Sequence, residues 1–152
     1  MPGDEPAATA ATMALIDRML ARWRADSARV RPGVSPAEIV AFEAAHHVKL
    51  PADLSAYFQR ANGMAGADWD EWLFRFYPVQ ELEAGLDHSP DLAGYYFFMD
   101  HSIWAFGYAI NLNPADPRYG QIVISHEPES PVTDSFTAFM QLYNDDPRSL
   151  IR

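Results

Sequence analysis

The hydrophobic pattern of this chain changes its period once, and that change limits the folds open to it. Up to Gly63, apolar side chains recur at helical spacing, whereas residues 72–125 consist of short aromatic and β-branched runs separated by turn residues. A last helical pattern starts near Asp134 or Ser135 and contains Phe136, Phe139, Met140 and Tyr143. Helices, then strands, then a closing helix predict an α+β domain with a helical cluster beside a mostly antiparallel sheet of about four or more strands.

A capping box marks the start of one helix. Ser35 and Glu38 are three residues apart and Pro36 stands at the first helical position. The serine oxygen can therefore accept one backbone N–H, and the glutamate can reach back to another. The buried face of this helix is predicted to contain Ile39, Phe42 and His46.

Two further helices are predicted beside this one. The first has Thr12 as a candidate N-cap, and its apolar face contains Met13, Ile16, Leu20 and Trp23. The other follows Leu50-Pro51 and is expected to end at Asn62-Gly63, because these residue types favour the left-handed backbone of a helix end. Residues 1–11 are small and polar and are predicted to form a flexible tail, so that one domain spans residues 12–152.

Four strands are predicted in the second half of the chain. They are Trp72 to Tyr77, Tyr95 to Met99, Ile103 to Leu112 and Gln121 to Ser125. A short helix is expected within residues 79–87, and Asp100-His101-Ser102 is typical of a hairpin turn. The short connections favour antiparallel pairing.

The composition excludes several classes of function. The chain has no cysteine, which excludes disulfides, zinc ribbons and thiol nucleophiles. Its formal net charge of −10 repels phosphate backbones and anionic lipids and favours a basic protein partner. No stretch approaches the roughly 20 apolar residues that cross a bilayer, and residues 1–12 lack the pattern of a secretory signal. We therefore expect a cytoplasmic protein that binds neither nucleic acid nor membrane.

Motifs for catalysis, cofactors and metals are weak in this sequence. The glycines lack the spacing of a phosphate-binding loop, and His46 and His47 are adjacent, so they point to different faces of a helix. Asp100-His101-Ser102 has the residue types of a hydrolase triad, but such a relay gathers residues that are distant in sequence. We expect no enzyme activity, no cofactor and no metal. The least favoured alternative is a hydrolase that uses His88, His101 or His126 with nearby carboxylates.

An acidic segment rich in tryptophan is the main candidate for partner binding. It consists of Asp68, Trp69, Asp70, Glu71 and Trp72. Tryptophans are frequent anchors of interfaces, and carboxylates complement a basic surface. A calcium loop is less favoured, because tryptophans interrupt the carboxylates and the glycine and distal glutamate of an EF-hand are missing. A second acidic patch is expected at Glu127 and Glu129.

Short motifs follow one another in a fixed order over residues 34–145. They are Ser35-Pro36-Ala37-Glu38-Ile39, Phe42-Glu43, Val48-Lys49-Leu50-Pro51, Tyr57-Phe58, Asn62-Gly63, the aromatic run Trp72 to Tyr77, Pro78-Val79 with Glu81-Leu82, the strand ending at Asp100, and Ser135-Phe136 with Phe139. This order resembles the SUKH superfamily. The resemblance implies an α+β fold with helices beside an antiparallel sheet, and it brings no catalytic residue. The predicted helix after Thr12 lies outside these motifs.

The motif residues are expected to define the fold rather than to contact a partner. This applies to Leu50, Pro51, Phe58, Asn62, Gly63 and Phe136. Glu43 has two interpretations, a contact residue or an interior carboxylate that needs a backbone or side-chain partner.

The resemblance also implies a function. Typical bacterial members of the superfamily are immunity proteins, which bind and neutralise a polymorphic toxin that is often a nuclease, and other members are regulators. We therefore expect a non-enzymatic protein-binding domain that covers the active face of a cognate toxin, the partner being a basic toxin domain. A standalone regulatory interaction module without a toxin is the alternative.

Overall fold

In the computed structural model, which describes residues 9–66 and 68–152, four α-helices accompany two antiparallel sheets. The helices are α1 (Ala10–Ala25), α2 (Pro36–His46), α3 (Ala52–Arg60) and α4 (Phe136–Asp145). In this part of the chain, none of the helices combines the length and the apolar character needed to cross a membrane. The α+β fold and its C-terminal helix agree with the sequence prediction.

The larger sheet has five strands in the order β3-β5-β6-β7, and β4 also pairs with β5. The strands are β3 (Phe74–Phe76), β4 (Glu83–Ala84), β5 (Tyr95–His101), β6 (Phe106–Asn111) and β7 (Ile122–Ile124). Two shorter strands, β1 (Val30–Pro32) and β2 (Ala61–Met64), form a separate pair. Arg75 lies opposite Asp100, which in turn lies opposite Gly107. Arg75, Asp100 and Gly107 therefore lie in one row across the three neighbouring strands β3, β5 and β6. This row is the centre of the candidate site described below.

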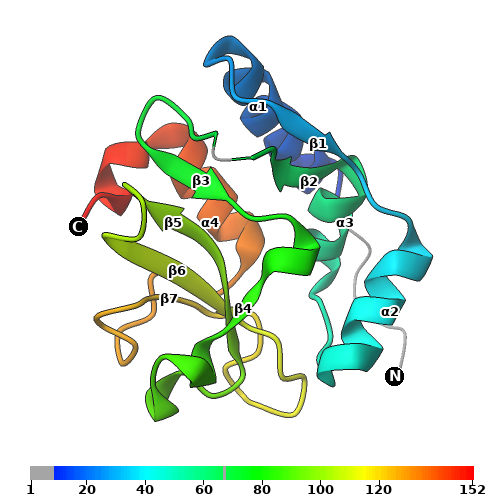
Figure 1. Ribbon diagram of the computed structural model, residues 1–152, viewed down its shortest axis with the longest axis vertical. Helices are drawn as coiled ribbons and strands as arrows, with labels where there is room; N and C mark the ends of the chain where they lie inside the picture. Colours follow the sequence, from blue (N-terminus) through cyan, green and yellow to red (C-terminus); the bar gives the residue numbers. More distant parts are fainter. Residues whose placement is uncertain (1–8, 67) are drawn as a thin grey trace.

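One face of the larger sheet carries the core. Figure 1 shows α4 lying against the sheet, with α1 and α3 next to it. The ring of Phe76 lies 4.9 Å from Trp23 of α1 and 5.0 Å from Tyr143 of α4. Phe98 of β5 packs on Phe136 and Phe139 of α4. Because side chains alternate along a strand, Arg75 points to the opposite, outer face.

The helix starts are fixed by side-chain caps. The predicted capping box is confirmed, with the Glu38 N–H donating to Ser35 Oγ at 3.2 Å and the Ser35 N–H donating to Glu38 Oε1 at 3.3 Å. Helix α1 begins at Ala10 and is capped by Thr9, so the prediction of Thr12 as its cap is wrong. Ala10 and Ala11, of the best helix-forming type, extend the helix towards its N-terminus and include Thr12 in it. Residues 1–8 of the predicted tail lie outside the described residues.

The Asn62-Gly63 motif lies in a strand and does not end a helix, contrary to prediction. Helix α3 ends at Arg60 and the motif belongs to β2. The Asn62 side chain accepts a hydrogen bond from the Val79 N–H at 2.7 Å, and a Cβ on Gly63 would lie 2.6 Å from the Tyr77 carbonyl carbon. The motif therefore joins β2 to the segment that follows β3.

Several predictions of strands, turns and burial need correction. Strands β1, β2 and β4 were not predicted, because they are two to four residues long and β2 has low intrinsic β-propensity. Asp100 and His101 continue β5 instead of forming a turn. The turn comprises residues 102–105, so Ile103 and Trp104 do not belong to the strand predicted from Ile103 to Leu112, which is β6 and begins at Phe106. The predicted helix within residues 79–87 is two 3₁₀ turns around β4. His46 is exposed, although its ring lies 4.3 Å from Phe42.

Candidate protein-interaction site

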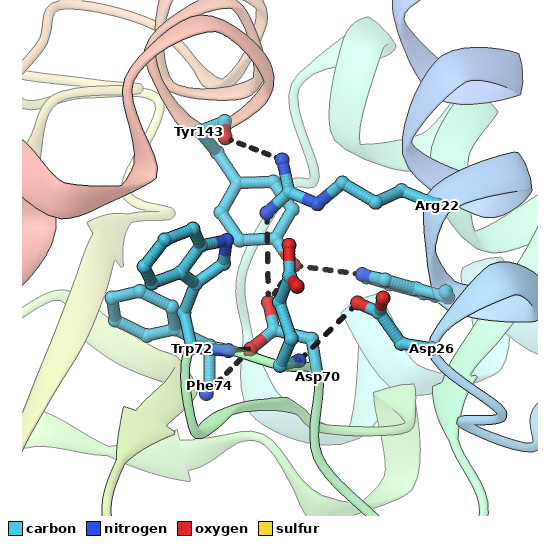
Figure 2. Close-up of polar contacts among 8 residues, drawn as sticks. Arg22, Asp26, Asp70, Trp72, Phe74 and Tyr143 are labelled. Atoms are coloured by element: carbon cyan, nitrogen blue, oxygen red, sulfur yellow. Dashed lines mark hydrogen bonds and ion pairs between the residues drawn. The ribbon is translucent and has the colours of Figure 1, made fainter.

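A buried polar network holds the loop that carries the predicted binding segment. Figure 2 shows the Asp70 carboxylate and the Arg22 guanidinium converging on Tyr143 of α4. Asp70 accepts hydrogen bonds from the Trp72 N–H at 2.8 Å, from the Phe74 N–H at 2.9 Å and from the Tyr143 hydroxyl. An Arg22 nitrogen lies 3.7 Å from the carboxylate. These contacts tie the loop to α1 and α4.

Asp70 therefore differs in role from its neighbours in sequence. Only 2% of the residue is exposed, so its carboxylate faces inward and is not available to a partner, which corrects the sequence interpretation of this residue. Burial raises the pKa of Asp70, against the hydrogen bonds and the Arg22 charge, which lower it. The role of Asp70 in the structure is to shape the loop.

The other four members of the segment are at least partly accessible. Trp69 is 43% exposed and Glu71 is exposed, whereas Trp72 is half-buried beneath the guanidinium of Arg148. Asp68 accepts hydrogen bonds from the Arg29 N–H at 2.8 Å and from its Nε at 3.0 Å, and these contacts lower the pKa of Asp68. The binding role of Asp68, Trp69, Glu71 and Trp72 stays a prediction.

Next to this loop, several exposed apolar side chains belong to residues whose backbone has the left-handed conformation. Leu73 has φ of 69°, and Ser102, Ile103 and Trp104 have φ of 50°, 55° and 64° in the turn between β5 and β6. Ile103 is 79% exposed. Positive φ is unfavourable for non-glycine residues, above all for a β-branched one, and costs about 1–3 kcal/mol per residue. Strained backbone of this kind is frequent at functional sites. The surface around Leu73 and the turn between β5 and β6 is therefore a candidate site.

Two adjoining hollows lie on the outer face of the sheet next to the turn between β5 and β6. We call these two hollows together the outer groove. The first has a volume of about 440 Å³, and its lining includes Arg75, Tyr77, Glu81, Glu83, Asp100 and Trp104. The second has a volume of about 250 Å³ and is lined by Trp69, Leu73, Arg75, Asp100 and Ile103. Because both hollows share Arg75 and Asp100, these two residues form a common floor. The exposed Trp69 of the predicted segment thus joins residues from β3, β5 and the turn.

Trp104 forms one wall of the outer groove. Its ring stacks on His88 at 5.3 Å and meets Phe97 at 5.0 Å. A Cβ on Gly107 would come within 3.0 Å of the Trp104 ring, so the missing side chain of β6 makes room for it. The tryptophan remains 37% exposed. Large apolar area held in place at low entropic cost is typical of an interface anchor.

The charged groups of the outer groove are mostly acidic. Arg75 donates hydrogen bonds to Glu81 at 3.2 Å and to the Gly66 carbonyl at 3.1 Å. The Tyr77 hydroxyl donates to Asp100 Oδ2 at 2.6 Å. Burial raises the pKa of Tyr77, and the adjacent Asp100 raises it further. Three carboxylates against one guanidinium make the groove a negative surface with apolar walls.

The remaining predicted residues lie elsewhere. Glu127 and Glu129 are exposed in the connection between β7 and α4, and Glu129 lines a separate hollow with Asp91 and Arg118. His88 lies 3.9 Å from Glu83, whereas His101 and His126 pack on Phe106. Within the described part of the chain, no group of three or more histidine, aspartate or glutamate side chains is placed to hold a metal ion.

Comparison with known protein families gives a match over most of these elements. Residues 33–142 match the model of the SMI1 / KNR4 family (SUKH-1). The chain belongs to the SMI1 / KNR4 family. A comparison with curated proteins finds no match. The SMI1 / KNR4 match includes the whole outer groove but begins after α1, so Arg22 lies outside it.

The sequence alone did not identify the groove within this SMI1 / KNR4 domain. Trp69 was predicted, whereas Leu73, Asp100, Ile103 and Trp104 were not assigned to binding. These four residues meet only through the pairing of β3, β5 and β6. One signal was present in the sequence: the run Ile103-Trp104 places two large apolar residues directly after a turn motif, where polar residues are common.

Proposed function

We propose that this SMI1 / KNR4 domain is a non-enzymatic, cytoplasmic immunity protein that binds and neutralises a cognate bacterial toxin. The observation that carries the proposal is the outer groove, in which Ile103 and Trp104 are presented on strained backbone beside acidic side chains. Strain of this kind is a cost to folding that binding can offset. The resemblance to SUKH immunity proteins supports the same assignment.

The proposed mechanism is occlusion. A toxin that acts on nucleic acid holds phosphates with arginine and lysine, and a protein of net charge −10 competes for that surface. The apolar side chains of the groove supply the desolvated centre of the interface, and the carboxylates around them supply complementarity. The predicted contacts Asp68, Glu71, Trp72, Glu127 and Glu129 extend this surface in the proposal.

Growth rescue tests this function. Each basic protein encoded beside the gene is expressed in a bacterial host, with and without the SMI1 / KNR4 protein. We expect one of these proteins to stop growth and the SMI1 / KNR4 protein to restore it. Ile103→Asn removes the apolar anchor while keeping a residue type that tolerates positive φ, so it should weaken binding at least about tenfold without unfolding the domain.

The matched control is Val40→Ala, which removes an exposed apolar side chain on α2, outside the groove. It should rescue growth as the unchanged protein does. If Ile103→Asn rescues equally at limiting expression, the groove is not the contact surface. If none of the neighbouring proteins is toxic, the immunity function is wrong and the regulatory module without a toxin is favoured.

A further inference from the structure

Asp100 is a nearly buried carboxylate that lacks a cation. The residue is 5% exposed, and its hydrogen bond comes from the neutral Tyr77 hydroxyl at 2.6 Å. Among residues 9–66 and 68–152, no lysine, arginine or histidine lies within ion-pair distance of it. A buried carboxylate is unfavourable unless an opposite charge accompanies it. Its position on the floor of the outer groove lets that charge come from outside.

The basic residue opposite Asp100 in the sheet is already engaged in other contacts. Arg75 lies opposite Asp100 in the β3–β5 register, yet its guanidinium bonds Glu81 and the Gly66 carbonyl. It also lies 5.1 Å above the Tyr77 ring. Arg75 therefore pairs with Glu81 at the rim of the groove and forms no ion pair with Asp100.

The walls of the groove suit a planar cation. The ring of Trp104, held by His88 and Phe97, borders the same hollow as Asp100, and Trp69 borders the adjoining one. Guanidinium groups stack on aromatic faces and bond carboxylates through two parallel N–H groups, whereas an ammonium ion does neither as well. The combination of a buried carboxylate and aromatic walls distinguishes an arginine from a lysine.

We propose that the outer groove receives one arginine side chain of the partner protein, with Asp100 as its counter-ion and Trp104 as its stacking surface. This inference rests on the proposed function, because it specifies which chemical group of the partner enters the groove. Ile103 and Leu73 are exposed and line the adjoining hollow, so in this proposal they supply apolar contacts around that arginine. The occupant is thus an arginine on a basic protein surface.

The test uses small probes, so that it does not require the partner. The ¹⁵N-labelled full chain is titrated with N-acetyl-arginine methylamide, and separately with the lysine and the uncharged citrulline analogues. We expect saturable shifts of the Asp100 and Trp104 backbone amides and of the Trp104 indole N–H with arginine, weaker shifts with lysine, and none with citrulline. Asp100→Asn keeps an acceptor for Tyr77 but removes the charge, and should weaken arginine binding about tenfold or more.

Two further variants complete this experiment. Trp104→Ala keeps the carboxylate and removes the wall, so it should also weaken binding. Asp134→Asn removes the same charge from an exposed residue outside the groove and should leave binding unchanged. Equal shifts with citrulline, or arginine binding unaffected by Asp100→Asn, would overturn the arginine assignment. Absent probe binding together with intact growth rescue refutes this inference alone, and probe binding without any rescued toxin refutes the immunity function alone.

Discussion

Buried tyrosine hydroxyls in this protein differ in whether they have a partner. The Tyr143 hydroxyl accepts a hydrogen bond from Trp23 Nε1 at 2.8 Å and donates one to Asp70. The Tyr57 hydroxyl is buried too, but within the described residues it has no hydrogen-bond partner, since its approach to the Gly63 N–H falls short of hydrogen-bond geometry. The two tyrosines form a matched pair for measuring the Asp70 network.

Tyr143→Phe is expected to lower the free energy of unfolding by about 1–3 kcal/mol, because it leaves the Trp23 N–H without its buried acceptor and removes one of the hydrogen bonds to the Asp70 carboxylate. Tyr57→Phe removes a hydroxyl that is not hydrogen-bonded and should change the free energy by less than about 0.5 kcal/mol. Urea unfolding of both variants measures the difference. Equal destabilisation would show that the network adds nothing beyond packing.

Hydrogen bonds lower the pKa of the Asp116 carboxyl. The side chain of Arg118, its backbone N–H and the Asn111 amide all donate to Asp116 and lower its pKa to about 2. Because this pKa lies below its ordinary value of 3.8, the stabilisation is complete above pH 3.8 and is lost as pH falls towards 2.

Carbon-detected NMR titration of the carboxyl groups measures this value. In Arg118→Ala the guanidinium is lost but the backbone N–H and Asn111 remain, so the pKa of Asp116 should rise while staying below 3.8. An Asp116 pKa that does not change in Arg118→Ala would contradict the assigned cause.

At the scale of elements, Gly63 joins the two sheets. Its φ is 70°, and a Cβ would lie 2.6 Å from the carbonyl of Tyr77, which directly follows β3. Gly94 has a similar φ of 84°, but a Cβ there meets its nearest neighbour at 3.5 Å, an ordinary contact. The two glycines separate backbone strain from steric overlap.

Gly94→Ala should therefore destabilise the protein by about 1–2 kcal/mol through backbone conformation alone. Gly63→Ala adds an overlap with rigid backbone and should cost about 1–3 kcal/mol more. Thermal and urea unfolding of the two variants give the comparison. Gly63→Ala being no worse than Gly94→Ala would mean that β2 moves freely relative to the segment after β3.

Local signals explain which elements the sequence revealed. The capping box at Ser35 and the start of the last helix near Asp134 or Ser135 are predicted from adjacent residues, and both are confirmed, with Ser135 as the cap of α4. Strand β2 has the sequence Ala-Asn-Gly-Met, which favours a turn, and it is extended because it pairs with β1. The outer groove escaped prediction for a related reason, since Ile103 and Trp104 adopt a backbone that neither residue prefers.

At the scale of the whole molecule, charge repulsion opposes folding. The net charge is −10, whereas ion pairs such as Arg18–Asp145 join side chains that are 55% and 51% exposed. Exposed pairs contribute little, about 0–1 kcal/mol each, so the repulsion should dominate the response to salt.

We therefore expect the unfolding midpoint at pH 7 to rise by about 2–4 °C between 10 mM and 500 mM NaCl, which corresponds to about 1 kcal/mol. Differential scanning calorimetry measures this change. The rise should shrink at pH 4, where part of the carboxylates are protonated. A midpoint that falls with salt would show that the ion pairs outweigh the repulsion.

Two selective pressures act in opposite directions on the left-handed turn at residues 102–104. A selection for heat resistance alone would replace its residues with glycine or asparagine, which adopt positive φ at little cost. A selection for recognition would retain Ile103 and Trp104, because their side chains form the walls of the outer groove. The residues found at this turn in a diverging lineage would therefore record which pressure had been stronger.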